Sequence, residues 1–479
     1  MPIRIETKRK AFCEELTEAR EKEYFNIKDK KFIQAIDNIY YNVYLEGDHN
    51  DNPYMSRLLS ILEYSKEQTR KKQEPQPYDD NLNIMPYGIR NFSYVLRSPD
   101  LYDICITPKL PTEDNPRIHV QLQAMGLWTR GVEEMMLESY EALRELIKPH
   151  DITIKKILEN RIDMCYHTNA VQNMKKEFFD HKLEKYMKTN LSWLRKEIEL
   201  KSKAGKSELK PTYLLIGSPK SNNLAARIYD KTIEVIEMGY KGYFIELWYK
   251  EGIINYYDKY CLSRAYKEKN YNSIHKARLE FYIEHNPQGK QVELFKEVLR
   301  KVRLEPSDVE EVADKYMPKV TTVINIEWQT MRKFYKSMDN FIDTQLKTEE
   351  REGMPANLER VFKITDNRRS ILDYLSRETL YFERSWWKRL QSTKVEGIKV
   401  KHQILREYNR ELDISMSQMK FVNSLVTHSV YKDSLETGIK EDYEAMMISL
   451  ESDNSKYLLE GYNRKKERKE HQVKNRKAR

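Results

Sequence analysis

The stretch LLIGSPKSNNLAARIYDKTIE, residues 214–234, decides both the expected fold and the expected site. It begins with apolar residues that are typical of a strand and turns at Gly217. A second strand is predicted over Ala225–Lys231, where the chain becomes apolar again but carries charged residues. The stretch therefore predicts two neighbouring strands joined by a polar turn.

Three side chains of the second strand suggest chemistry. Successive side chains of a strand point to opposite faces, so Arg227, Tyr229 and Lys231 are expected on one face. Two cations can bind a phosphate, and a phenol can attack one. The pattern indicates a candidate phosphodiester-cleaving site. The alternative is a sheet surface that carries ordinary Lys, Arg and Tyr side chains.

Composition limits the class of protein. The chain has 479 residues, of which 39% are hydrophobic and 33% charged, so two or three folded domains are expected. The net charge of +9 favours a polyanionic partner, although much of the excess lies in residues 464–479. Four scattered cysteines and the absence of any apolar run of about 18 residues predict a cytoplasmic protein with no membrane span.

The expected fold class is α+β, with a largely antiparallel sheet, helices on one face, and a mostly helical C-terminal region. Strands are expected at 35–45, 118–122 and 275–283, and long helices at 171–200, 320–346 and 356–390. The expected domains are a charged helical extension (1–34), an α+β domain (35–290), a helical region (291–460) and a basic tail (461–479).

Two acids and a histidine could hold a divalent cation. Asp163 and His167 alternate on one face of the strand RIDMCYH, and Glu280 lies in the expected strand HKARLEFYI. Carboxylates are the usual ligands of Mg²⁺ or Mn²⁺, and an imidazole would shift the preference toward Mn²⁺. The alternative is that each acid pairs with the arginine two residues before it.

Six segments, in order, resemble the Rep trans family of rolling-circle plasmid replication initiators and conjugative-element relaxases. They are AIDNIYYNVYL, IHVQLQAMGLW, RIDMCYH, YLLIGSPKSNNLAARIYDK, HKARLEFY and SWWKRL. Apart from the last, they lie between about residues 36 and 283. Two departures from the family pattern are His167, where the family has a second acid, and AMGLW in place of its GQG turn.

The resemblance implies a DNA strand-transfer enzyme that leaves a 5′-phosphotyrosine and a free 3′-hydroxyl. It implies Tyr229 as nucleophile, Arg227 and Lys231 as phosphate-binding cations, and Asp163 and Glu280 as metal ligands. Residues 35–290 would then be the catalytic domain.

We therefore expect a site-specific, metal-dependent nicking–joining enzyme that initiates rolling-circle replication or conjugative transfer on a plasmid or mobile element. Expected partners are double-stranded and single-stranded origin DNA, a helicase of the host or the element, and a second copy of the chain. The alternative functions are a DNA-binding protein of the same fold that does not cut, and a helical scaffold. If Tyr229 is not the nucleophile, Tyr213, Tyr240 and Tyr243 are the next candidates.

Overall fold

The computed structural model describes residues 18–26, 30–48, 52–99, 101–112, 115–178, 186–189, 191, 194–203, 206–218, 223–301 and 306–392. The chain divides into two compact units, residues 1–67 with 76–407 and residues 68–75 with 408–479. All the sites discussed below lie in the first unit. The expected basic tail lies outside the described residues.

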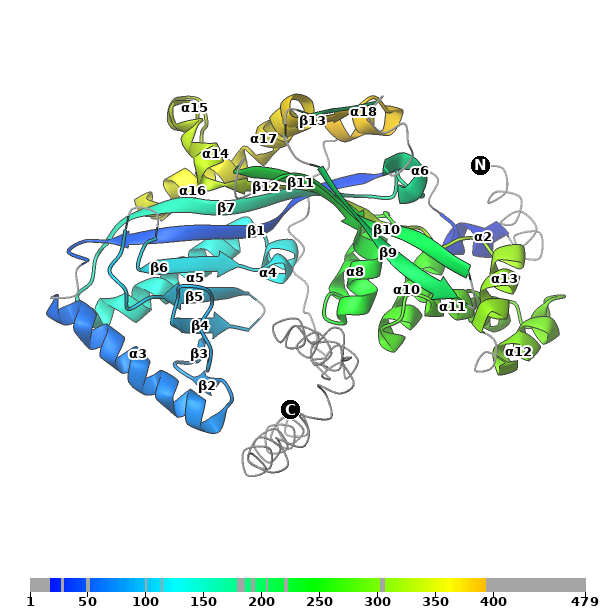
Figure 1. Cartoon of the computed structure of the whole chain (residues 1–479), viewed down its shortest axis with the longest axis horizontal. Helices are drawn as coiled ribbons and strands as arrows, with labels where there is room; N and C mark the ends of the chain where they lie inside the picture. The colour runs from blue at the N-terminus through cyan, green and yellow to red at the C-terminus, as the bar shows by residue number, and fades with distance from the viewer. Residues whose placement is uncertain are drawn as a thin grey trace, which may run out of the picture. The chain divides into compact units, whose positions relative to one another are not determined.

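A large antiparallel sheet organises the first unit (Figure 1). In the described residues it has eleven strands in the order β2-β3-β4-β5-β6-β1-β7-β12-β11-β10-β9. The strands are β1 (Phe32–Leu45), β2 (Gln76–Pro77), β3 (Asn83–Ile84), β4 (Tyr94–Ser98), β5 (Tyr102–Ile106), β6 (Ile118–Leu122), β7 (Ile154–Thr168), β9 (Leu194–Lys203), β10 (Lys206–Ser218), β11 (Leu224–Asp230) and β12 (Ile324–Met331). A separate pair joins β8 (Met187–Thr189) to β13 (Leu380–Phe382).

One face of the sheet is apolar because alternate residues of each central strand are hydrophobic. Ile39, Ile162, Ile228 and Ile326 all belong to the main core cluster on this face. Helices that pack there are α3 (Pro53–Lys72), α5 (Val132–Ile147), α14 (Arg332–Lys336), α15 (Asp339–Thr344), α16 (Glu359–Asp366), α17 (Arg368–Tyr374) and α18 (Ser385–Gln391). Figure 1 shows α14 and α16 beside β7 and β12.

The second face is partly covered by a smaller core. Ile33, Ala35 and Cys165 pack there against helices that follow β6 and β11. These helices are α4 (Ala124–Thr129), α8 (Lys231–Met238), α9 (Tyr243–Lys250) and α10 (Tyr256–Glu268). A third cluster joins α10 to α2 (Glu18–Tyr24), α11 (Ser273–His285), α12 (Val292–Lys301) and α13 (Pro306–Tyr316). Polar side chains of the central strands occupy the rest of this face.

The α+β class, the largely antiparallel sheet and the helical region that follows it are confirmed. Three secondary-structure predictions are wrong. The expected helix at 320–346 contains β12, and the expected strand at 275–283 is part of α11. The expected helix at 171–200 contains α6 (Met174–Phe178), β8 and the start of β9. The sheet therefore takes a central strand from beyond residue 290.

No helix in the described part of the chain combines the length and the apolar character that crossing a bilayer requires.

Candidate functional site

The central strands bring the candidate residues onto the second face of the sheet. In the register of β11 and β12, Arg227 lies opposite Glu327 and Tyr229 lies opposite Asn325. In the register of β12 and β7, Gln329 lies opposite Asp163. Because the residues between them are buried in the main core, these polar side chains share the opposite face. Arg227, Tyr229 and Asp163 thus lie on one face of the sheet, and the alternation in the sequence predicted this for Arg227 and Tyr229.

The Tyr229 hydroxyl lies in a network of three polar groups. Asn325 Nδ2 donates a hydrogen bond to it at 2.8 Å, and Lys231 Nζ donates one at 3.2 Å. The hydroxyl itself donates to Glu327 Oε2 at 3.3 Å. It therefore has one acceptor for its proton and two donors that would stabilise the oxyanion left behind.

The phenol is not acidic at rest. Burial raises the pKa of Tyr229 well above its ordinary value, while the Lys231 ammonium acts in the opposite direction. The residue is half-buried, so one side of it faces solvent. A phenol with a raised pKa needs a base in contact before it can act as a nucleophile, and Glu327 is in contact.

Glu327 and Asp163 are two fully buried carboxylates that face one cationic atom. Arg227 forms an ion pair with Glu327, and its Nη2 lies 3.9 Å from Asp163 Oδ2. Arg161 Nε donates to Asp163 Oδ1 at 2.8 Å. Burial raises the pKa of the Glu327 carboxyl to about 7, and the Arg227 guanidinium opposes that shift.

Lys231 reaches Tyr229 from a helix rather than from the strand. β11 ends at Asp230, whose carboxylate caps α8 by accepting from the backbone N–H groups of Thr232 and Ile233 at 2.9 and 3.1 Å. The expectation that Lys231 continues the strand is wrong, because this cap starts a helix at Lys231. Its fully buried side chain nevertheless returns to the phenol.

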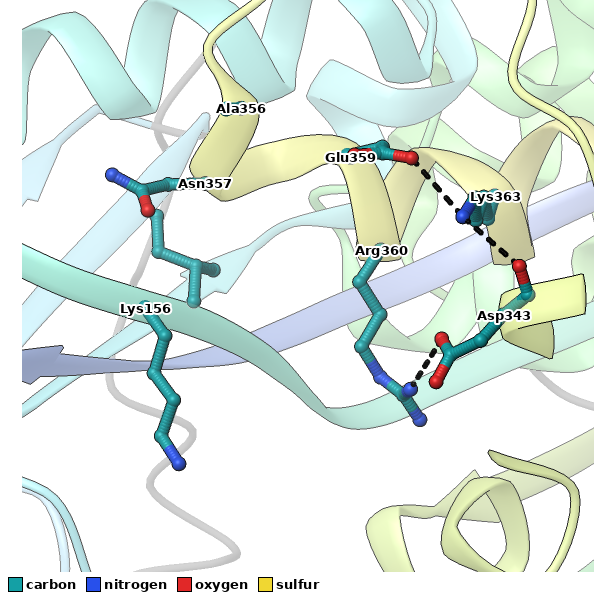
Figure 2. Close-up of a pocket in the computed structure, with 8 residues that line it drawn as sticks. Lys156, Asp343, Ala356, Asn357, Glu359, Arg360 and Lys363 are labelled. Carbon is teal, nitrogen blue, oxygen red and sulfur yellow. Dashed lines mark hydrogen bonds and ion pairs between the residues drawn. The ribbon is translucent and has the colours of Figure 1, made fainter. Parts of the chain in front are cut away.

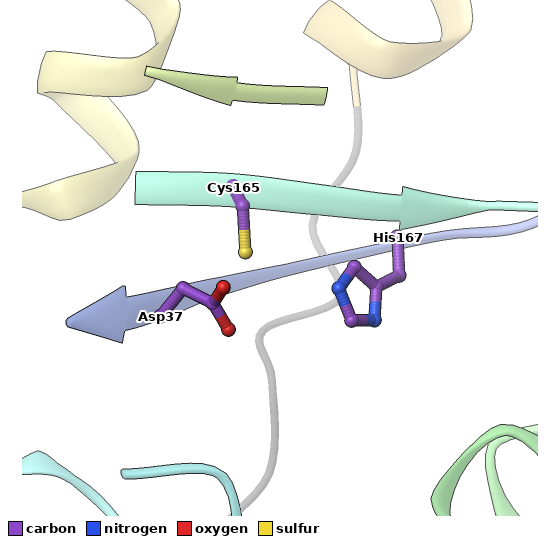
Figure 3. Close-up of side chains that lie close together, drawn as sticks. All are labelled: Asp37, Cys165 and His167. Atoms are coloured by element: carbon purple, nitrogen blue, oxygen red, sulfur yellow. The ribbon is translucent and has the colours of Figure 1, made fainter. Parts of the chain in front are cut away.

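His167 lies in a different place from Asp163. The two residues are four apart on β7, which separates their backbones by about 13 Å in a strand that rises about 3.3 Å per residue. His167 instead forms a buried group with Asp37 of β1 and Cys165, whose potential ligand atoms all lie within 4.8 Å of one another. Figure 3 shows the three side chains turned toward the same space.

The hydrogen bonds of that group do not fit a metal ion. Trp248 Nε1 lies 3.1 Å from His167 Nδ1, and because an indole nitrogen can only donate, Nδ1 must accept. The imidazole proton is then on Nε2, which leaves no lone pair there for a metal. Burial lowers the pKa of His167 well below its ordinary value, and this keeps the ring neutral. The Lys231 ammonium, 3.7 Å from Asp37 Oδ2, already supplies the positive charge.

Glu280 does not join Asp163 and His167. It lies on α11, where Lys276 Nζ is 3.6 Å from its carboxylate, one helical turn away. In the described residues these three predicted ligands form no group with metal-ligating spacing. The segment is helical because its buried residues recur every three or four positions, as at Ile274, Ala277 and Phe281.

Sequence reasoning missed Glu327, Asn325 and Asp37. Glu327 and Asn325 lie in the segment INIEWQTM, where apolar and polar residues alternate from Ile324 to Gln329, and that alternation is a strand signal. No local signal identified Asp37, because its role depends on a bulge in β1.

A surface pocket at the other end of β7 is lined by charged residues (Figure 2). Two of its three cations, Arg360 and Lys363, are already paired with acids within the protein. Arg360 binds Glu159 at 2.7 Å and Asp343 at 3.2 Å, and Lys363 binds Glu359 at 3.0 Å. These pairs tie α16 to the sheet and to α15, which is a structural role.

No protein-family model and no curated protein sequence matches the chain. Among solved structures, a rolling-circle replication initiator protein from Geobacillus stearothermophilus is similar, with a TM-score of 0.37 and 9% sequence identity. The likeness covers 77% of this chain and 100% of that one. Because the TM-score is so low, this structural likeness supports no conclusion about function, and a functional proposal must rest on the geometry of the site.

Proposed function

We propose that this protein is a metal-dependent DNA nicking–joining enzyme of the rolling-circle initiator or relaxase type, with Tyr229 as nucleophile. The observation that carries the proposal is the set of three contacts on the Tyr229 hydroxyl, one to a carboxylate and two from donors. A tyrosine that only packs in a sheet does not need an adjacent base and an adjacent cation together.

The contacts support one sequence of steps. Glu327 takes the phenolic proton as Tyr229 Oη attacks the phosphorus of a DNA phosphodiester. The Oη–P bond forms, the bond from phosphorus to the 3′ oxygen breaks, that oxygen takes a proton from water, and Glu327 returns the phenolic proton to the solvent. The products are a 5′-phosphotyrosine and a free 3′-hydroxyl, and the reverse attack by a 3′-hydroxyl rejoins the strand.

Two cationic side chains, Lys231 and Arg227, and the neutral amide of Asn325 would stabilise the charges that develop in this reaction. Lys231 Nζ and Asn325 Nδ2 both point at the attacking oxygen, and their hydrogen bonds hold the phenol in one orientation. Arg227 lies opposite Glu327 on the same face, where a guanidinium can bind a phosphate with two hydrogen bonds. We assign Arg227 to the scissile phosphate.

Asp163 and Glu327 fit a hard divalent cation better than the predicted set with Glu280 does. Arg227 Nη2 contacts both carboxylates in this structure, so a Mg²⁺ or Mn²⁺ ion would take oxygen ligands from β7 and β12 once Arg227 has turned to the scissile phosphate. Glu327 would bind the ion through Oε1, which leaves Oε2 for the Tyr229 proton. When bound, such an ion polarises the phosphate and stabilises the charge that develops on it. We propose this pair as the metal ligands, with Glu327 in place of Glu280.

The substrate in this proposal is origin DNA, presented as a single strand at the nick. A helicase and a second copy of the chain remain proposed partners. The alternative is a DNA-binding protein with the same sheet that does not cut. The basic composition fits both functions, and only the contacts on Tyr229 favour cleavage.

The test uses purified full-length protein, Mn²⁺, and a supercoiled plasmid that carries the DNA flanking the gene. We expect the wild type to relax the plasmid and Tyr229→Phe to lose this activity while its affinity for the same DNA stays within about twofold. A Tyr213→Phe variant is the matched control, because Tyr213 lies opposite Tyr229 in the register of β10 and β11. If Tyr229→Phe cuts normally, the nucleophile is another residue; if the wild type never cuts, the binding-only alternative holds.

A further inference from the structure

Asp37 lies in a β-bulge that turns its carboxylate toward the site. β1 pairs with β7 through Ile36 and Met164 and then through Asn38 and Asp163, so two steps along β1 match one step along β7. Asp37 is the residue between them, and it is 4% exposed. A bulge leaves its extra residue out of the ladder and re-aims the side chain. Here the re-aimed group is a buried acid.

Two groups hold that acid in place. Trp128 Nε1 donates to Asp37 Oδ1 at 2.8 Å, and Lys231 Nζ lies 3.7 Å from Oδ2. Burial raises the pKa of Asp37, but the Lys231 ammonium, together with the smaller effects of other nearby charges and of the Trp128 hydrogen bond, outweighs burial and lowers the pKa to about 2. Asp37 is therefore a carboxylate, and it faces a lysine that is itself fully buried.

The same lysine is the cation of the Tyr229 network. Its Nζ lies 2.8 Å from Glu234 Oε2, 3.2 Å from the Tyr229 hydroxyl and 4.9 Å from the centre of the Phe244 ring. A buried ammonium is stable only when anions compensate for lost hydration. Asp37 and Glu234 are the two acids beside it, and they approach from different elements, β1 and α8.

We propose that Asp37 is a positioning residue for strand cleavage, which acts by holding the Lys231 ammonium against the Tyr229 hydroxyl. This inference rests on the proposed function. Asp37 touches neither Tyr229 nor the phosphate, and its effect passes through Lys231. It also gives a role to Asp37, which lies in a group with Cys165 and His167 whose hydrogen bonds do not fit a metal ion.

The kinetic test is a double-mutant cycle measured as the single-turnover nicking rate. We expect Lys231→Met to lower the rate about 100-fold, as loss of a group that stabilises an oxyanion does, and Asp37→Asn to lower it about tenfold. Because Asp37 acts through Lys231, the double variant should be as slow as Lys231→Met alone. Binding of the same DNA should stay within about twofold in all three. Effects that multiply would overturn the proposal.

Asp48→Asn is the matched control for simple loss of a buried ion pair. Asp48 binds Arg117 at 2.6 Å, and Arg117 is fully buried, as Lys231 is. Asp48 follows the end of β1, eleven residues after Asp37, and Arg117 immediately precedes β6. We expect Asp48→Asn to nick at the wild-type rate per folded molecule. Equal rates for Asp37→Asn and Asp48→Asn would overturn the proposal.

A second measurement does not need cleavage. With 3-fluorotyrosine placed at position 229, the ¹⁹F resonance reports the surroundings of the phenol in the full-length protein. We expect Asp37→Asn and Lys231→Met to shift this resonance and Asp48→Asn to leave it unchanged. A wild type that never cuts would reject the proposed function. The ¹⁹F resonance would still test whether Asp37 holds Lys231 against the Tyr229 hydroxyl, and an unchanged resonance in Asp37→Asn would overturn that inference.

Discussion

Two short segments with nearly the same pattern have opposite structures. HKARLEFYI, in α11, and INIEWQTM, in β12, both alternate polar and apolar residues around one glutamate. In α11 the glutamate, Glu280, pairs with Lys276 on a partly exposed helix face. In β12 the glutamate, Glu327, is fully buried and contacts both Arg227 and Tyr229.

The contacts of Arg278 show that the segment HKARLEFYI in α11 has a structural role. Arg278 is almost fully buried, and its guanidinium donates to the carbonyl oxygens of Ala313, Met317 and Pro318 at 2.8–3.0 Å. These carbonyls end α13, so the arginine caps that helix. The comparison teaches that a glutamate in an alternating segment joins the site only when that segment forms a strand that pairs with the strand carrying Tyr229.

The largest expected effect separates the two glutamates. Glu327→Gln removes the base beside Tyr229 and should lower the nicking rate about 100-fold or more. Glu280→Gln should leave the rate within about twofold, because its side chain has no contact with the network. Single-turnover nicking rates in Mn²⁺ check both. Equal losses, or a larger loss in Glu280→Gln, would restore Glu280 to the site.

The next effect concerns the helical region and stability. Arg278→Met removes the hydrogen bonds to three carbonyls at the C-terminal end of α13 and the ion pair with Asp314, and should lower the free energy of unfolding by about 3 kcal/mol. Urea titration at pH 7 measures the loss. Arg264→Met is the control, because its pair with Glu284 is exposed and should contribute less than about 1 kcal/mol. A neutral Arg278→Met would contradict the capping role.

A smaller effect is expected from the sheet region as the pH falls. Burial lowers the pKa of His119 to about 4, so between pH 6.5 and 4 the unfolded chain binds the proton and the folded chain does not. Stability contributed by the neutral ring is present above about pH 6.5 and is lost as the pH falls. From pH 7 to pH 5, we expect His119→Gln to lose about 2 kcal/mol less than the wild type. Parallel pH curves for the two proteins would contradict this.

The smallest effect is expected at the pair on α11. Lys276 and Glu280 are partly exposed and one helical turn apart, so the pair should contribute less than about 0.5 kcal/mol. Thermal unfolding of Glu280→Gln at low and high salt measures it. A loss above about 2 kcal/mol would show that this segment has a larger role than the structure gives it.

Much of the site was predictable because it depends on local alternation. The strand carrying Arg227 and Tyr229, and the strand carrying Asp163, follow from residues that alternate within a few positions. Lys231 was expected beside Tyr229, where the structure has it, but on the strand rather than on a helix, because the Asp230 cap ends the strand one residue earlier. The α+β class follows from the same strand signals.

The rest depended on distant pairing. β12 lies about 100 residues after β11 in sequence, and only the register of the sheet places Glu327 opposite Arg227. α11 and β12 share an alternating pattern, so pattern alone could not choose between them. Asp37 points into the site because of a bulge in β1, and the sequence of β1 does not predict that bulge.

The most direct test of the central claim is to identify the residue that becomes joined to DNA. Full-length protein is incubated with Mn²⁺ and a single-stranded oligonucleotide from its own nick site, digested with nuclease and protease, and analysed by peptide mass spectrometry. The account predicts a 5′-phosphotyrosyl adduct on Tyr229 that is absent in Glu327→Gln at early times. An adduct on Tyr213, Tyr240 or Tyr243, with Tyr229 unmodified, would contradict it.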